Sequence, residues 1–158
     1  MMIWLLMTLL IILPVVLVYW SIVKSLSFFN AESTLTLAYC FIWGGIIAVV
    51  FSMAWESAFI EAFGGYLDQE GINFFSTVLF APLIEELFKG FGILILFLIA
   101  LNTRKGLRGP LSGLVYGGII GLGFALSEDI GYMMSAAEDS GLLGILLTYF
   151  GRVILLGL

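Results

Sequence analysis

The chain has 158 residues, of which 62% are hydrophobic and 11% are charged, and its mean hydropathy is +1.19. Soluble domains are about half apolar and about a quarter charged, so this composition excludes an ordinary soluble domain and indicates an integral membrane protein. The net charge of −5 and the scarcity of basic residues give no support for nucleic-acid binding.

Five apolar stretches approach the roughly 20 residues that a membrane-spanning helix needs. They cover residues 3–23, 35–59, 74–101, 111–134 and 142–158. The first stretch has no Lys or Arg before it and is too long for the apolar core of a signal peptide, so we expect a retained helix. The sequence therefore predicts an all-α, polytopic membrane bundle. Residues 1–158 would form a single transmembrane domain that is part of a larger bundle.

The connecting segments predict one orientation in the membrane. Residues 102–110 carry three basic residues and no acid, which places this loop in the cytoplasm by the positive-inside rule. The segments 64–71 and 135–140 carry acids and no base, and alternation places both outside. The N-terminus is then also expected outside.

A cluster of charges interrupts the third apolar stretch. Glu85, Glu86 and Lys89 lie within five residues of one another, although one charged residue at the centre of a membrane helix costs about 2.5–3.5 kcal/mol. On a helix the three side chains project into one arc, and Pro82 can kink the helix one turn before them. Such a cost favours a functional site inside the bilayer, although a buried ion network that only fixes helix packing is the structural alternative.

The fourth stretch carries a second candidate acid. Gly113, Gly117 and Gly121 are spaced by four residues, and Glu128 follows on the same helical face. Faces of small residues let membrane helices approach closely. We therefore expect this face to pack against another helix and Glu128 to point at that neighbour instead of at lipid.

The two candidate sites are predicted to meet. Glu85 and Glu128 lie at nearly equal sequence distances before and after Gly106, so a hairpin of the two helices brings them to one depth. Adjacent carboxylates resist joint ionisation, so one can activate a water while another protonates a leaving amine. Glu85, Glu86, Lys89 and Glu128 are the candidate catalytic residues.

Alternatively, the carboxylate oxygens could bind a divalent cation. The chain contains no histidine, so Glu85, Glu86 and Glu128 would form an all-oxygen site, which suits hard cations better than zinc. No cofactor is otherwise indicated. The single cysteine, Cys40, excludes an internal disulfide and is expected to pack as a small hydrophobe.

Four further charged residues receive smaller roles. Asp129 lies off the glycine face and is expected behind the site or at its entrance. Glu56 and Glu61 are expected to be solvated or helix-terminal near the outer interface. Arg152, inside the fifth stretch, either pairs with an acid of the cluster or extends to an interface.

These residues carry a family resemblance. Ala81 to Lys89 reads Ala-Pro-x-x-Glu-Glu-x-x-Lys, and Gly113 to Asp129 reads Gly-x-x-Tyr-Gly-x-x-x-Gly-x-Gly-Phe-Ala-x-x-Glu-Asp, followed by Tyr132. In motif order and spacing, residues 74–158 resemble the PrsW family of intramembrane proteases, which is related to the CAAX-protease and bacteriocin-processing group.

The resemblance implies a protease of the bacterial cytoplasmic membrane that cleaves a single-span membrane protein, such as an anti-sigma factor, within or near the bilayer. Catalysis in this group has been assigned both to glutamates and to a metal. The family also carries a third motif, with a histidine, on a later helix. Residues 151–158 resemble the lead-in to it, so we expect the sequence to be incomplete at its C-terminus; a chain ending at Leu158 would lack that motif.

Two other functions remain open at this stage. The acids of the site also fit a non-enzymatic membrane protein that binds a cation or relays protons, as transporters do. A degenerate family member that binds a membrane partner without cleaving it is the third hypothesis. Cleavage of a substrate, ion flux or binding alone would distinguish them.

Overall fold

The computed structural model describes residues 1–26, 32–103 and 109–156 of the chain. Within these ranges all regular structure is helical and there is no strand. In chain order, and with η for π-helical segments, the elements are α1 (Met2–Ser25), α2 (Thr34–Ile42), η1 (Trp43–Ala48), α3 (Val49–Phe63), α4 (Gln69–Phe74), η2 (Phe75–Phe80), α5 (Ala81–Thr103), α6 (Pro110–Thr148) and η3 (Tyr149–Leu156).

Three helical stretches are long and apolar enough to cross a membrane: Met2–Ser25, Thr34–Phe63 and Pro110–Leu155. Another long stretch, formed by α4, η2 and α5, carries Glu85, Glu86 and Lys89 among its apolar residues. Helices satisfy every interior backbone hydrogen bond within one segment, which is why apolar spans adopt them in lipid. The prediction of an all-α membrane bundle is confirmed.

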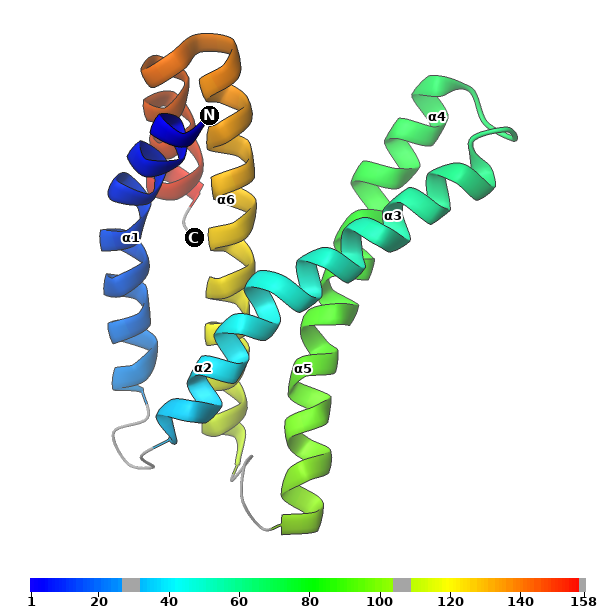
Figure 1. Ribbon diagram of the computed structural model, residues 1–158. Helices are drawn as coiled ribbons and strands as arrows, with labels where there is room; N and C mark the ends of the chain where they lie inside the picture. The colour runs from blue at the N-terminus through cyan, green and yellow to red at the C-terminus, as the bar shows by residue number, and fades with distance from the viewer. Residues whose placement is uncertain (27–31, 104–108, 157–158) are drawn as a thin grey trace.

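The expected fourth and fifth spans fall within the single stretch Pro110–Leu155, which turns sharply at Gly141. Gly141 has φ 60° and ψ −139°, a conformation that residues with a Cβ rarely adopt. After this turn the chain comes back as η3 along the upper part of α6 (Figure 1). The basic residues 104–108, which decided the predicted orientation, lie outside the described residues.

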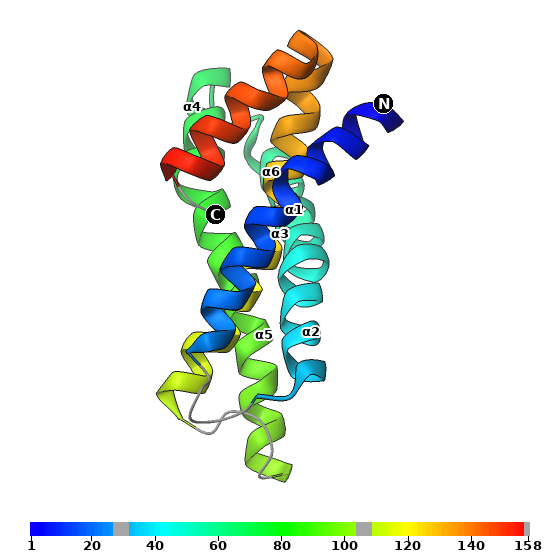
Figure 2. The same ribbon diagram turned by 90° about the vertical axis from the view of Figure 1, so that its left-hand side faces the viewer.

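Helix α6 is the centre of the bundle. It lies between α1 on one side and the continuous helix of α2, η1 and α3 on the other (Figures 1 and 2). Tyr116, Ile119 and Ile120 of α6 are at most 1% exposed and belong to the same apolar cluster as Ile12 of α1 and Leu37 of α2. Because α1 is apolar on all sides, its partner decides which face is buried.

Helix α6 and η1 cross with their backbones in close contact. A Cβ added to Gly44 would collide with the carbonyl of Ile120, and one added to Gly123 would collide with the carbonyl of Phe41. The Ser127 hydroxyl donates a hydrogen bond of 2.5 Å to the carbonyl oxygen of Gly45. This crossing fixes α6 against η1 immediately before Glu128.

Near the opposite end of the bundle, Glu32 fastens the segment before α2 to the start of α6. Its carboxylate accepts hydrogen bonds from the hydroxyls of Ser112, at 2.6 Å, and Tyr116. Both donors are buried, whereas Glu32 is half-buried. The acid thus replaces water as the acceptor for two hydroxyl groups inside the bundle.

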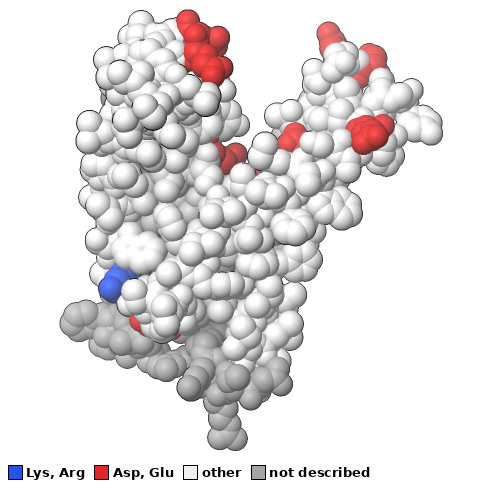
Figure 3. Space-filling model, viewed as in Figure 1, with Lys and Arg blue, Asp and Glu red and all other residues white. Residues whose placement is uncertain are grey.

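Beyond the crossing, the bundle divides into two arms. Helix α3 and the α4–η2 stretch run together away from α6 (Figure 1), and the space-filling view shows a V-shaped notch between the two arms (Figure 3). The ring of Phe59 on α3 stacks on that of Phe80 in η2, with centroids 4.1 Å apart. The two helices of this arm are therefore joined to each other, while their contact with α6 is lost above the crossing.

Candidate active site

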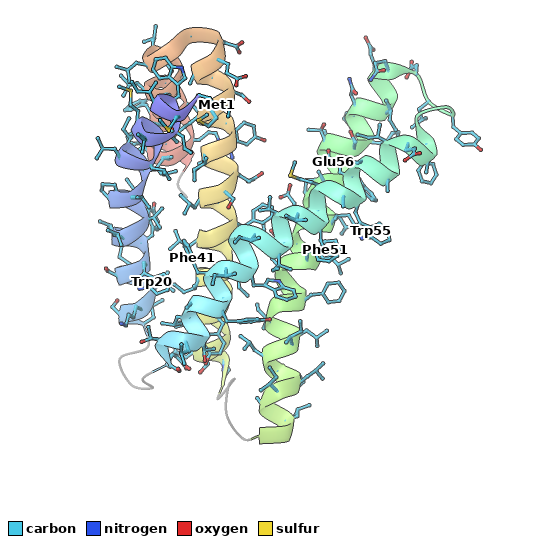
Figure 4. All side chains as sticks on the ribbon, viewed as in Figure 1. Met1, Trp20, Phe41, Phe51, Trp55 and Glu56 are labelled. Carbon is cyan, nitrogen blue, oxygen red and sulfur yellow. The ribbon has the colours of Figure 1, made fainter. Side chains whose placement is uncertain are left out.

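A cavity of about 430 Å³ lies between α3, the η2–α5 junction and α6. Glu56, Glu85 and Glu128 line it, one from each of these three helices. No Lys or Arg is among its lining residues. Acidic side chains are visible in the notch between the two arms in Figure 3, and Figure 4 labels Glu56 on α3 beside that notch. The cavity therefore brings together carboxylates from three segments far apart in the sequence.

The geometry of η2 and Pro82 sets the position of Glu85. Proline has no N–H to donate and its ring crowds the carbonyl four residues earlier, so an α-helix that contains it needs a local adjustment. The π-helical segment η2 ends at Phe80, directly before Ala81 and Pro82, and Pro82 itself lines the cavity. Glu85, one turn later, has a side chain that is 26% exposed and directed into the cavity.

Lys89 lies between the two neighbouring acids of α5. Its Nζ is 2.8 Å from Oε1 of Glu86 and 3.8 Å from Oε2 of Glu85. The Glu86 side chain is 74% exposed and is not part of the cavity lining. The structure thus separates the paired acids of the motif: Glu85 faces the cavity, while Glu86 holds Lys89 from outside it.

Two aromatic side chains hold α5 in place around Lys89. Its Nζ lies over the ring of Phe124 on α6, 3.9 Å from the ring centroid, which is the geometry of a cation–π contact. On the other side, the indole Nε1 of Trp43 donates a hydrogen bond of 2.9 Å to the carbonyl oxygen of Phe88. Helix α5 is therefore fastened to both η1 and α6 at the residues that flank Lys89.

Glu128 faces a cation from another segment. Its Oε2 is 3.7 Å from Nη2 of Arg152 in η3, and its side chain is 31% exposed. Arg152 also donates a 2.9 Å hydrogen bond from Nε to Oδ1 of Asp129, whose side chain is only 5% exposed. The question of whether Arg152 pairs with an acid or extends to an interface is answered in favour of pairing, and Asp129 lies behind the cavity as expected.

Glu56 is a site residue that the sequence interpretation missed. We expected it to be solvated or helix-terminal, but α3 continues to Phe63, and Glu56 is half-buried on the cavity wall. Glu61, one turn further on, is exposed as expected. The available signal was Ser52, four residues before Glu56 on the same helical face and also part of the cavity lining.

The glycine face of α6 plays a different part from the one predicted. A Cβ at Gly121 would meet nothing within 4 Å, and one at Gly117 would only reach ordinary contact with Ile93, 3.4 Å away. The close helix contact is made by Gly123 instead. Gly121 lines a second cavity, of about 420 Å³, together with Lys89, Phe124 and Glu128. Glu128 nevertheless points at neighbouring helices, as expected, because Arg152 faces it.

The carboxylates were also candidates for holding a cation. In the described ranges, no three acidic, cysteine or histidine side chains converge closely enough to hold a metal ion. Glu86 faces away from Glu85 and Glu128, and the oxygens of those two are already close to Lys89 and Arg152. The described side chains therefore do not form a metal site among themselves.

The arrangement is suited to acid–base chemistry. Glu85 and Glu128 line one cavity. Two carboxylates in a site of low dielectric resist being ionised together, which favours a pair with one charged and one protonated member. A charged carboxylate accepts a proton from water, and a protonated one donates to a leaving group. The cavity thus holds two carboxylates from different helices, the groups that general acid–base catalysis requires.

The comparisons with known proteins give the family of the chain. A family model described as PrsW family intramembrane metalloprotease matches residues 32–157, which include every charged side chain discussed above. No curated protein and no solved structure matches the chain significantly. On this match, which covers well over half of its length, the chain belongs to the PrsW family of intramembrane metalloproteases.

Proposed function

We propose that the protein is an endopeptidase that cleaves membrane-anchored proteins within or near the bilayer, and that Glu85 and Glu128 carry the chemistry. The observation that carries this proposal is the shared cavity: α5 and α6 each place one carboxylate on its wall, and each carboxylate is close to a cation. Membership of an intramembrane protease family supports the same reaction class.

The proposed step is direct hydrolysis of a peptide bond. One carboxylate of the pair takes a proton from a water molecule while the water oxygen attacks the carbonyl carbon. The C–N bond then breaks, and the second carboxylate, in its protonated form, gives its proton to the departing nitrogen. Lys89 and Arg152 limit the cost of negative charge in this step, because each lies within 4 Å of one carboxylate.

The family description also implies a metal ion, which when bound would polarise the substrate carbonyl and activate water. The described side chains do not gather a ligand set for it. Glu85 and Glu128, with Glu56 across the cavity, are the oxygen donors that this part of the chain offers. The proposed proton transfers therefore involve the chain's own carboxylates, and no step passes through a metal.

The proposed substrate is a single-span membrane protein of the anti-sigma-factor kind. Two of the three helical stretches that line the cavity are long and apolar enough to cross a membrane, so we propose that a substrate reaches the cavity from within the membrane. Its volume of about 430 Å³ accommodates a few residues of extended chain and not a folded domain. We further propose a location in the bacterial cytoplasmic membrane, with the N-terminus outside and residues 102–110 in the cytoplasm.

The test is cleavage by purified protein. The full-length protein is reconstituted in liposomes with single-span reporter proteins, and new peptide termini are identified by mass spectrometry. Glu85→Gln and Glu128→Gln should each abolish the new termini, because glutamine keeps the shape and loses the proton transfer. Glu61→Gln, an exposed acid on α3, is the matched control and should cleave normally.

Other outcomes would point to the alternative functions. Proton or cation flux through these liposomes, without new termini, would favour a transporter. Reporter binding without either flux or cleavage would favour a partner-binding member of the family. Cleavage that persists in both glutamine variants would contradict the proposed site while leaving the protease activity itself in place.

A further inference from the structure

The role of the last described segment, η3, is not explained by the acid–base pair alone. Its residue Arg152 is half-buried, with 36% of the side chain exposed, and contacts three side chains of α6. An arginine in an apolar segment is costly unless its donors are satisfied. The contacts of Arg152 therefore indicate what the charge is used for.

The guanidinium group is held in one orientation by two of these contacts. Its Nε donates to Oδ1 of Asp129 at 2.9 Å, and its Cζ lies 3.8 Å from the centroid of the Tyr132 ring. The Asp129 side chain is 5% exposed. Arginine presents its donors in a rigid planar fork, so fixing Nε and the ring plane also fixes the direction of the remaining nitrogens.

The remaining nitrogen faces the candidate catalytic acid. Nη2 of Arg152 is 3.7 Å from Oε2 of Glu128, which is an ion-pair distance. The contact between Nε of Arg152 and Oδ1 of Asp129, at 2.9 Å, is short enough for a hydrogen bond. Glu128 lines the cavity, but neither Asp129 nor Arg152 does. Arg152 thus contacts Glu128 without itself lining that cavity.

We propose that Arg152, oriented by Asp129, is the positioning residue for Glu128. The inference rests on the proposed function, because it gives η3 a part in the same reaction. Asp129 holds the guanidinium group, and the guanidinium group directs the Glu128 carboxylate toward the cavity. The turn at Gly141 brings η3, and with it Arg152, next to these two acids of α6. Misplacement of a reacting group by about 1 Å costs on the order of 100-fold in rate.

The experiment measures kcat and KM for reporter cleavage by the full-length protein in liposomes. Arg152→Gln should lower kcat by roughly 100-fold with little change in KM, since Glu128 is misdirected while the cavity stays open. Arg152→Lys should recover only a small part of that loss, because lysine retains the charge but has no planar fork for Asp129 and Tyr132 to orient. Asp129→Asn should lower kcat in the same direction, whereas Asp139→Asn, an exposed acid further along α6, should leave it unchanged.

A charge exchange separates positioning from packing. In Asp129→Arg/Arg152→Asp the ion pair between α6 and η3 is retained, but a carboxylate now faces Glu128. The inference expects a protein that accumulates in the membrane with near-normal thermal stability and still fails to cleave. This double variant also decides the question if Arg152→Gln does not fold.

Two results would overturn the inference. Full kcat in Arg152→Gln, or full kcat in the charge-exchanged variant, would show that Arg152 only joins η3 to α6. An unsubstituted protein that cleaves no reporter is a different result: it would contradict the proposed function, and the positioning role would fall with it.

Discussion

The two halves of this bundle are packed in opposite ways. At the crossing of η1 and α6, glycine backbones touch and the surrounding side chains of α1, α2 and α6 are almost entirely buried. In the described residues, the arm of α3, α4, η2 and α5 contributes only Leu96 to the buried members of that apolar cluster, and a cavity separates the arm from α6. The carboxylates of the candidate site lie where the packed half meets the open half.

This difference shows how a membrane protein positions polar groups. The close crossing leaves α6 little freedom, so Glu128 and its neighbour Ser127 are held on a rigid element. The open arm then creates space in front of Glu128 without disturbing that element. π-helical segments are often found at functional sites, and here each of the three lies directly before, or contains, a residue that shapes the cavity or contacts its acids.

The largest effect is expected inside the open half. Glu85→Gln should lower kcat by about 10²–10⁴-fold, the range for removing a general acid or base, because Glu85 faces the cavity. Glu86→Gln should lower it much less, by about tenfold, which is about 1.4 kcal/mol, because Glu86 acts only by holding Lys89. Reporter cleavage in liposomes compares the two. Equal losses would contradict the division of roles between these neighbours.

The packed half should respond through stability instead. Gly123→Ala places a methyl group against the Phe41 carbonyl and the Gly45 amide. Overpacking of this kind costs about 1–3 kcal/mol, measurable as the free energy of unfolding in mixed micelles. Gly90→Ala is the matched control: a Cβ there meets nothing within 4 Å, so it should leave stability unchanged or raise it by up to about 1 kcal/mol.

A smaller effect is expected at the contact that joins the two halves. Trp43→Phe keeps most of the aromatic surface but removes the hydrogen bond from Nε1 to the Phe88 carbonyl. The expected loss is about 1 kcal/mol of stability, together with weaker cleavage, since α5 is less firmly held beside Lys89. Thermal unfolding and kcat measured on the same preparation would test both. Unchanged kcat would show that this hydrogen bond is not needed to hold Lys89 in place.

The smallest effect is expected on the wall of the cavity opposite the pair. Glu56→Gln retains the side-chain shape and removes one negative charge from the cavity. Because Glu56 is outside the proposed proton transfers, kcat/KM should change by less than about tenfold, or about 1.4 kcal/mol. Glu61→Gln on the same helix provides the baseline. A loss as large as that of Glu85→Gln would make Glu56 a third member of the catalytic group.

The apolar spans and the acids interrupting them were readable from the sequence, because lipid allows few backbone structures and makes buried charge expensive. The pairing of Glu85 with Lys89 followed from helical periodicity, and the meeting of Glu85 with Glu128 from counting outward from one loop. The role of Glu56 was not readable in this way. Its position on the cavity wall depends on how far α3 continues and on which helix lies opposite. Ser52 on the same helical face was a local sign of a polar surface, but it did not identify the neighbouring helix.

The sequence by itself determined the class of the molecule, because its composition suits a lipid environment. It also supplied the candidate reactive groups, because helical spacing shows which charged residues share a face. Tertiary structure alone decided that Glu56 shares the cavity of Glu85 and Glu128. It separated Glu86 from Glu85, assigned the close contact to Gly123 instead of Gly121, and brought Arg152 to Glu128 through the turn at Gly141. Those outcomes depend on crossing angles and on a single backbone reversal, which arise from packing between distant segments and not from any one of them.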